Sequence, residues 1–228
     1  MSKKSQKEET IVDVQEVYSK SEMFIDKNRK IIFGIIGGIA LLVAGYYAYN
    51  KLYMLPREQK AAGEMWMAQV WFNEENSELA LAGDDVYAGF EEIADKYSGT
   101  NAAKLANYYM GIIYRDKGTA EDFQTALDYF LVAADLKDQA IGPLAAGNAG
   151  DMYVELGDNA KALECFEDAA DRSDNVFISS TYLMKAAQLC MLEGNNDPAK
   201  KYLSRIIEDY PTSSQFADAE KYLAAIGG

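Results

Sequence analysis

The sequence predicts an all-α protein: one N-terminal transmembrane helix, followed by an α-solenoid of about three to four helix pairs and a capping helix. Two observations carry this prediction. Near the N-terminus, 19 consecutive residues lack a charge. In the rest of the chain, a pattern of small and large apolar residues with helical spacing recurs at intervals of 39 and 37 residues.

The uncharged stretch Ile31–Tyr49 reads IIFGIIGGIALLVAGYYAY. As a helix it would be roughly 28 Å long, which matches the hydrocarbon core of a bilayer. Polar residues bound it on both sides, and tyrosines up to Tyr53 gather at its C-terminal end, where aromatic rings favour the membrane interface. We therefore predict a transmembrane helix over residues 31–53. A cleaved signal peptide is the alternative, because Val43-Ala44-Gly45 resembles a cleavage site.

The flanking charges predict the orientation of this helix. Lys20, Lys27, Arg29 and Lys30 precede it closely, whereas Lys51, Arg57 and Lys60 follow it. Because the positive side tends to stay in the cytoplasm, residues 1–30 are predicted to be cytoplasmic and residues 54–228 to lie outside. In a Gram-negative bacterium this places the chain in the inner membrane and its large C-terminal part in the periplasm.

Two further features of the N-terminal region suggest contacts. Residues 8–27 carry apolar side chains at three- to four-residue spacing, which predicts a short amphipathic helix that docks on a partner or lies on the membrane. The transmembrane helix carries small residues that would let a second helix approach closely, although such residues are also common in membrane helices generally. These predicted helix-contact residues are Gly34, Gly38, Ala40, Ala44 and Ala48.

The recurring pattern begins with a small anchor residue, followed 12, 16 and 19 residues later by a small, a large and a small or medium apolar residue. From the anchor Gly150 these are Ala162, Phe166 and Ala169, and from Ala187 they are Ala199, Leu203 and Ile206. From Gly111 the series Ala126, Phe130 and Ala133 comes three residues later. We assign the extra residues to a longer turn within DKGTAEDFQ.

The spacing predicts pairs of antiparallel helices that stack. The anchor lets the two helices of a pair cross closely, and the large residue is expected to fill the groove to the next pair. A weaker unit precedes these three, with a first helix near Arg57–Asn73 and with Phe90 and Ile93 on its second helix. The final stretch SQFADAEKYLAAIGG predicts a capping helix.

These segments resemble the tetratricopeptide repeat (TPR) family. The matching stretches are YYMGIIY with the A…F…A series after it, GNAGDMYVELGDNAKALECFEDA, and KAAQLCMLEGNNDPAKKYLSRIIEDYP. One span followed by an acidic TPR body further resembles the YfgM-like family of bacterial inner-membrane proteins, as does YSGTNAAKLANYYMGIIY. That resemblance implies a periplasmic TPR domain associated with the SecYEG translocon and with the membrane-anchored chaperone PpiD.

The TPR resemblance also implies which residues face the concave groove of the solenoid. These positions mix aromatic residues and methionine with few charges, which suits an apolar or amphipathic segment of a partner. Only Arg115 offers the basic chemistry of TPR domains that clamp a C-terminal carboxylate, so we do not expect a clamp. The predicted partner-binding residues are Tyr108, Ile112, Arg115, Asp151, Val154, Glu155, Met184, Gln188 and Met191.

Composition excludes several functions. Residues 57–228 hold 14 Lys/Arg against 30 Asp/Glu, a net charge of −16 that repels nucleic acids. The chain has no histidine, which excludes every histidine-dependent nucleophile or metal site. The two cysteines, Cys165 and Cys190, are expected on adjacent helices, where they either pair in an oxidising compartment or act as small core residues.

We therefore predict a non-enzymatic scaffold at the Sec translocon, with protein partners and without a cofactor, metal or small-molecule substrate. A structural subunit of another envelope complex, such as secretion, motility or division machinery, is the alternative. An enzyme would need a cluster of carboxylates or lysines, and no motif in the sequence assembles one.

Overall fold

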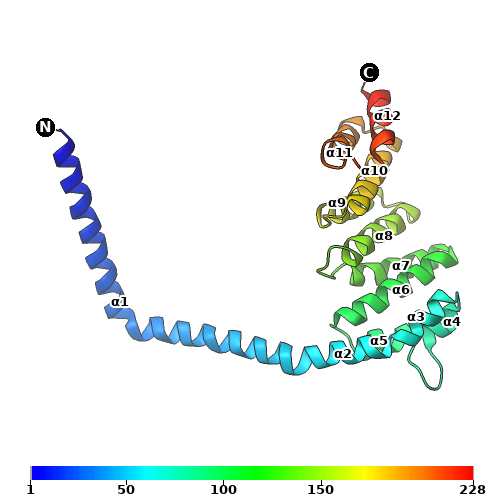
Figure 1. Ribbon diagram of the computed structural model, residues 1–228, viewed down its shortest axis with the longest axis horizontal. Helices are drawn as coiled ribbons and strands as arrows, with labels where there is room; N and C mark the ends of the chain where they lie inside the picture. Colours follow the sequence, from blue (N-terminus) through cyan, green and yellow to red (C-terminus); the bar gives the residue numbers. More distant parts are fainter. Residues whose placement is uncertain (1, 228) are drawn as a thin grey trace. The chain divides into compact units, whose positions relative to one another are not determined.

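The computed structural model describes the backbone of residues 2–227 and the side chains of Met23 and residues 25–227. The chain divides into two compact units, Met1–Pro56 and Arg57–Gly228. The first unit comprises the helix α1 (Ser2–Tyr49), the π-helical turn η1 (Asn50–Met54) and the first two residues of the next helix, and is coloured blue to cyan in Figure 1. The backbone of the predicted amphipathic stretch thus belongs to one continuous helix. Its side chains before Met23 lie outside the described residues.

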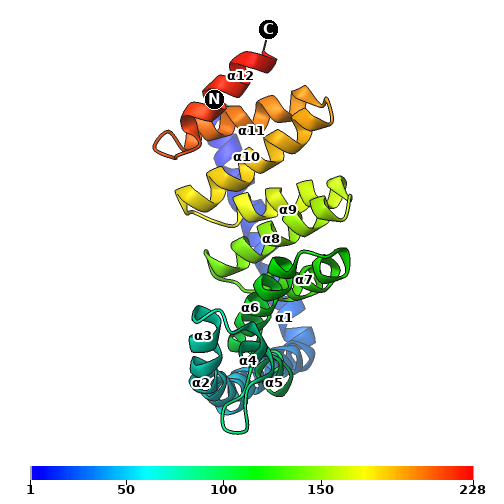
Figure 2. The same cartoon turned by 90° about the vertical axis from the view of Figure 1, so that its right-hand side faces the viewer.

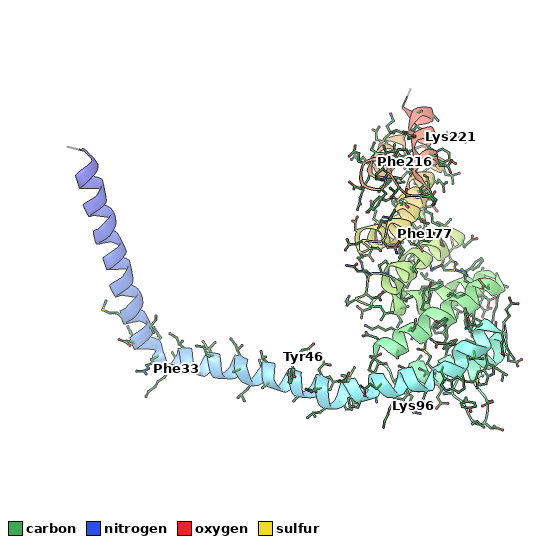
Figure 3. The ribbon with its side chains drawn as sticks, viewed as in Figure 1. Phe33, Tyr46, Lys96, Phe177, Phe216 and Lys221 are labelled. Carbon is green, nitrogen blue, oxygen red and sulfur yellow. The ribbon has the colours of Figure 1, made fainter. Side chains whose placement is uncertain are left out.

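The apolar part of α1 is exposed on all sides. Phe33 and Tyr46 stand out from the helix in Figure 3, and Leu41 and Leu42 are each 76% exposed. Tyr49 and Tyr53 stack at the C-terminal end, with ring centroids 5.3 Å apart. Among the described residues, one helix is long and apolar enough to cross a membrane, judged by length and composition.

The second unit is a stack of helices that follow one another in chain order (Figures 1 and 2). The helix pairs α6–α7, α8–α9 and α10–α11 pack against each other in sequence, and α12 covers the last pair. This is the predicted TPR-type solenoid with its capping helix. The helices are α2 (Leu55–Glu64), α3 (Trp66–Asn73), α4 (Ser77–Ala82), α5 (Phe90–Lys96), α6 (Asn101–Lys117), α7 (Ala120–Ala133), α8 (Ile141–Glu155), α9 (Asn159–Asp171), α10 (Val176–Leu192), α11 (Asn196–Asp209) and α12 (Phe216–Ile226).

The anchor glycines bring the two helices of a pair together, as predicted. A Cβ atom at Gly111 would lie 2.7 Å from the ring of Phe130, and one at Gly150 would lie 2.6 Å from the ring of Phe166. The large residue therefore packs first on the anchor of its own repeat, rather than filling only the groove to the next one. Phe166 does both, because its ring also stacks on Tyr182 of the following repeat at 6.0 Å.

The turn between α6 and α7 is not lengthened, contrary to the expectation from DKGTAEDFQ. Only Gly118 and Thr119 separate these helices, whereas three residues separate α8 from α9. The extra residues instead extend the helices themselves, mainly the N-terminus of α7. The Thr119 hydroxyl accepts a hydrogen bond from the backbone N–H of Asp122 and so starts α7 early.

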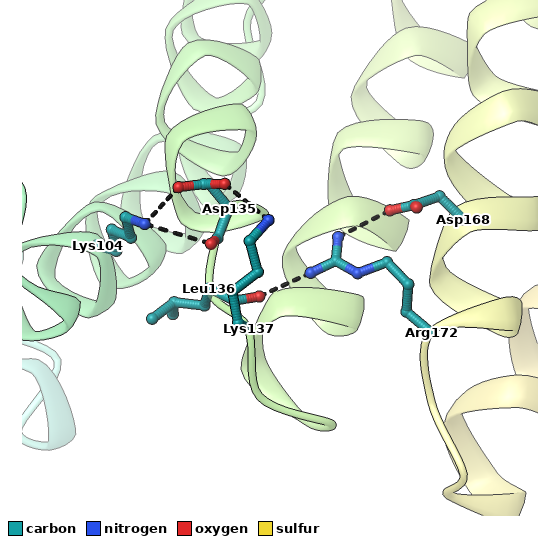
Figure 4. Close-up of polar contacts among 6 residues, drawn as sticks. All are labelled: Lys104, Asp135, Leu136, Lys137, Asp168 and Arg172. Atoms are coloured by element: carbon teal, nitrogen blue, oxygen red, sulfur yellow. Dashed lines mark hydrogen bonds and ion pairs between the residues drawn. The ribbon is translucent and has the colours of Figure 1, made fainter. Parts of the chain in front are cut away.

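Polar contacts fasten the loop between α7 and α8 to its neighbours (Figure 4). Lys104 on α6 binds both the carboxylate and the carbonyl oxygen of Asp135. Arg172, just after α9, donates to the carbonyl oxygen of Leu136 at 2.7 Å and to the carboxylate of Asp168 at 2.8 Å. Of these bonds, the one from Arg172 to Leu136 connects the second pair to the loop that follows the first pair.

The unit before the regular pairs is more irregular than predicted. The expected first helix is divided into α2 and α3, which meet at the buried residue Met65. Phe90 and Ile93 on α5 are fully buried, as predicted for the second helix. The carboxylate of Glu58 on α2 accepts the backbone N–H groups of Asn101 and Ala102, at 2.7 and 2.8 Å, and caps α6.

Candidate functional site

A hollow of about 420 Å³, which we call the groove hollow, lies in the stack of regular helix pairs. Most of its wall comes from the C-terminal halves of α8 and α10, with single contributions from α6, α7 and α9. More than half of the lining side chains are apolar. The lining residues are Arg115, Phe123, Asp151, Met152, Val154, Glu155, Phe166, Lys185, Gln188, Leu189 and Leu192.

The positive charge of Lys185 is neutralised within the hollow. Its ammonium nitrogen lies 2.7 and 2.6 Å from the two carboxylate oxygens of Asp151 across the α8–α10 contact. The same ammonium group lies over the rings of Tyr182 and Phe166, 5.3 and 5.8 Å from their centroids. This pair therefore holds two repeats in register and leaves little free charge for a ligand.

A second set of polar contacts connects α6, α8 and α10 beside the hollow. Arg115 donates to the side-chain oxygen of the buried residue Asn148 at 3.0 Å, and Asn148 in turn donates to the carbonyl oxygen of Leu144. The hydroxyl of Tyr182 reaches the same carbonyl at 3.3 Å. The Tyr182 ring occupies the space that a Cβ at Gly147 would need, and this burial raises the pKa of Tyr182 above its usual range.

The rim of the hollow is open and keeps one acidic group. Leu192 is 85% exposed, and Val154 is also exposed. Glu155 is exposed, and its side chain forms no hydrogen bond or ion pair with any residue whose side chain is described. The hollow thus offers apolar side chains, paired charges and one free carboxylate at its edge. This combination of apolar side chains and a rim carboxylate has the chemistry that suits an amphipathic segment.

The structure brings together five of the nine predicted groove residues. Tyr108 and Ile112 lie instead against the core cluster between α6, α7 and α8, while Met184 is 4% exposed within the C-terminal core and Met191 packs against it. The five that line the hollow are Arg115, Asp151, Val154, Glu155 and Gln188.

Sequence reasoning missed the other lining residues. Lys185, Leu189 and Leu192 each lie one position after Met184, Gln188 and Met191. No signal in the sequence marked Leu192, because its 85% exposure results from the packing of α10.

The predicted contact residues of the transmembrane helix all lie on α1, and they are exposed. Nothing lies within 4 Å of a Cβ atom built at Gly34 or Gly38. A close approach by a second helix at this stripe remains a prediction.

Both cysteines are free thiols. Cys165 on α9 packs against the core cluster that contains Phe130 and Met152, whereas Cys190 is buried on α10. Burial raises the pKa of Cys165 to about 11, with the charges of Asp168 and Glu164 adding to the effect. Burial likewise raises the pKa of Cys190. Thiols of this kind react slowly at neutral pH.

Comparison with known families identifies the repeat itself. Residues 182–213, which run from Tyr182 on α10 through α11 to the turn after it, match the tetratricopeptide repeat. The chain thus contains one segment that matches this repeat, and the stacking of its helix pairs is consistent with a TPR solenoid. No curated protein matches the chain.

Proposed function

We propose that this TPR-containing chain is a non-enzymatic, membrane-anchored scaffold that binds another protein in the groove hollow. The observation that carries the proposal is the composition of the hollow. Apart from the rim carboxylate of Glu155, its charged side chains are paired within the chain, as Lys185 is with Asp151. Leu192 and Val154 remain exposed at its rim. Binding an amphipathic segment there buries this apolar surface without breaking an ion pair.

We further propose that α1 anchors the chain in a bacterial inner membrane, with the N-terminus in the cytoplasm and the TPR body in the periplasm. The proposed partners are the SecYEG translocon and a PpiD-like chaperone. The support for this part is the distribution of lysine and arginine around α1 and the resemblance to YfgM-like proteins described above.

Photocrosslinking in intact cells tests both parts. A photoreactive residue replaces Leu192 at the rim of the hollow, and the same residue replaces Leu131 on α7 in a matched control. Leu131 is also an exposed leucine, at 44%, but it does not line the hollow. Purification through a tag after Gly228 and mass spectrometry then identify the adducts.

Translocon subunits or a periplasmic chaperone crosslinked from position 192, but not from 131, are the expected result. Equal adducts from both positions would contradict the groove hollow as the binding surface. Specific adducts with a different envelope complex would contradict the Sec assignment and favour a structural subunit of that complex. The orientation is checked with a cysteine placed at position 23 or at position 228 and a membrane-impermeant thiol reagent. In cells with an opened outer membrane, only the cysteine at position 228 should react.

A further inference from the structure

A rigid loop projects between α4 and α5. Its two ends cross closely, because Gly83 forms an isolated antiparallel bridge with Ala88. Gly83 has a φ of +78°, and a Cβ atom at Gly89 would overlap the backbone of Leu81 and Gly83. Only glycine fits both positions, so the neck of the loop is closed by the backbone itself.

Asp84 forms the hydrogen bonds inside this loop. One of its carboxylate oxygens accepts the backbone N–H groups of Val86 and Tyr87, at 2.8 and 2.7 Å, and its own N–H donates to the carbonyl oxygen of Tyr87 at 3.0 Å. The loop is therefore ordered before any partner binds, even though Val86 at its tip is 75% exposed.

The loop also positions an aromatic surface. The ring of Tyr87 packs edge-on against Trp66, with centroids 5.5 Å apart, and against Trp71 at 6.4 Å. Trp71 belongs to the core, whereas Trp66 is 49% exposed. The indole of Trp66 is thus held in one orientation at the surface of the TPR body.

Beside these rings lies a cavity of about 510 Å³, which we call the loop cavity. Its wall carries four carboxylates and one ammonium group. Lys96 is already engaged, because it lies 2.9 Å from Glu64 and 3.7 Å from Glu92. Asp85 is exposed and has no hydrogen bond or ion pair among the described residues. The lining residues are Gly63, Glu64, Trp66, Asp84, Asp85, Val86, Tyr87, Ala88, Glu92 and Lys96.

We propose that the loop cavity is a second docking site, which takes an arginine or lysine side chain from a basic segment of a protein partner. The exposed indole of Trp66 offers the aromatic face that binds cations best, and Asp85 supplies an unpaired negative charge beside it. Arginine suits the site better than lysine, because its planar guanidinium group stacks on an indole while donating to carboxylates.

The charge of the cavity distinguishes this partner from a membrane surface. Trp66 and Tyr87 are residue types that also favour the membrane interface. Four carboxylates against one lysine, within a body of net charge −16, repel anionic lipid headgroups and attract a basic protein segment. The loop cavity and the groove hollow have no lining residue in common, so this proposal stands independently of the proposed function.

The test uses the full chain in a nonionic maltoside detergent and a fluorescent peptide of alternating arginine and glycine. Fluorescence anisotropy measures binding, and a citrulline–glycine peptide serves as the uncharged control. Only the arginine peptide should bind. Trp66→Leu should weaken its binding by about two- to fivefold, which corresponds to an exposed cation–π contact. Asp85→Asn, which leaves the loop hydrogen bonds of Asp84 in place, should weaken binding by a similar factor.

Glu164→Gln is the matched control, because it removes one exposed negative charge from α9, away from the cavity. If Glu164→Gln and Asp85→Asn weaken binding equally while Trp66→Leu has no effect, attraction to the acidic body explains the binding and the proposal fails. Circular dichroism checks that Trp66→Leu folds.

A Trp71→Phe variant tests the membrane alternative, because it leaves Trp66 as the only tryptophan. In nanodiscs that contain brominated lipids, Trp66 fluorescence should remain unquenched if the cavity binds protein. Strong quenching would place the indole in the membrane interface and overturn the proposal.

Discussion

Enlarging Gly111 while shortening Phe130 tests whether the size of the anchor residue and the size of the side chain that packs on it are matched in each repeat. In the first two regular repeats a glycine anchor faces a phenylalanine ring, whereas the third has Ala187 and Leu203, both fully buried in one core cluster. The larger anchor thus accompanies the smaller partner. We expect the double variant Gly111→Ala/Phe130→Leu to adopt the packing of the third repeat.

The size of the effect follows from the contact. The new methyl group of Gly111→Ala would lie 2.7 Å from two carbons of the Phe130 ring, an overpacking that costs about 1–3 kcal/mol. Higher helix propensity offsets about 1 kcal/mol of this cost. Phe130→Leu alone loses buried area and leaves a cavity, which costs about 1–3 kcal/mol. In the double variant the methyl group fills part of that cavity, so the cost should fall about 1–2 kcal/mol short of the sum.

Urea unfolding of the full chain in detergent, followed by circular dichroism, measures the three free-energy changes. Gly63→Ala on α2 is the matched control for helix propensity, because nothing lies within 4 Å of the added Cβ atom. That control should be neutral or stabilising. Single changes that add to within about 0.5 kcal/mol in the double variant would refute the size-exchange reasoning.

Two further predictions concern pH and thiol chemistry. Hydrogen bonds from Lys104, and then from Lys137, lower the pKa of Asp135 to about 2 from its ordinary 3.8. Since the folded-state pKa is depressed, the contact stabilises the fold fully above about pH 4 and is lost as the pH falls toward 2. An acid titration followed by circular dichroism should therefore be shallower in this range for Asp135→Asn, and an unchanged curve would contradict the contact. In the second prediction, a thiol-reactive dye should label Cys165 slowly at pH 7.5 in the folded chain and rapidly in urea, because burial raises its pKa to about 11. Rapid labelling of the folded chain would show that Cys165 is accessible as a thiolate.

The repeat pattern could be predicted because it reflects a local requirement. A close helix crossing needs a small residue, and the offsets from Gly150 to Ala162 and Phe166 follow from the helix length and the turn. For the repeat that begins at Gly111, the sequence predicted the correct number of extra residues. It placed them in the turn, whereas the structure has them in the helices. Thr119 is an N-cap that shortens the turn, and a cap three residues before Asp122 was visible in the sequence.

The candidate site was only partly predictable. Offsets taken from the TPR resemblance found Asp151 and Gln188, yet they placed Met184 in the groove rather than Lys185. Neighbouring residues on a helix point in directions that differ by about 100° around its axis. Which of them faces the groove depends on the side chains that the neighbouring helices bury. The loop cavity had no periodic signal at all, because its residues come from α2, α3, α5 and the loop that Asp84 holds.

By itself, the sequence determined the apolar segment of α1, the acidic charge of the body, and the succession of helix pairs with their cap. These properties depend on composition and on spacing along the chain, which tertiary contacts do not alter. Only the tertiary structure decided which charges are neutralised, as in the Lys185–Asp151 pair, and which apolar side chains, such as Trp66 and Leu192, stay exposed. Many of the residues that pair with or cover one another are 30 or more positions apart in the sequence. Only packing in three dimensions brings such residues together.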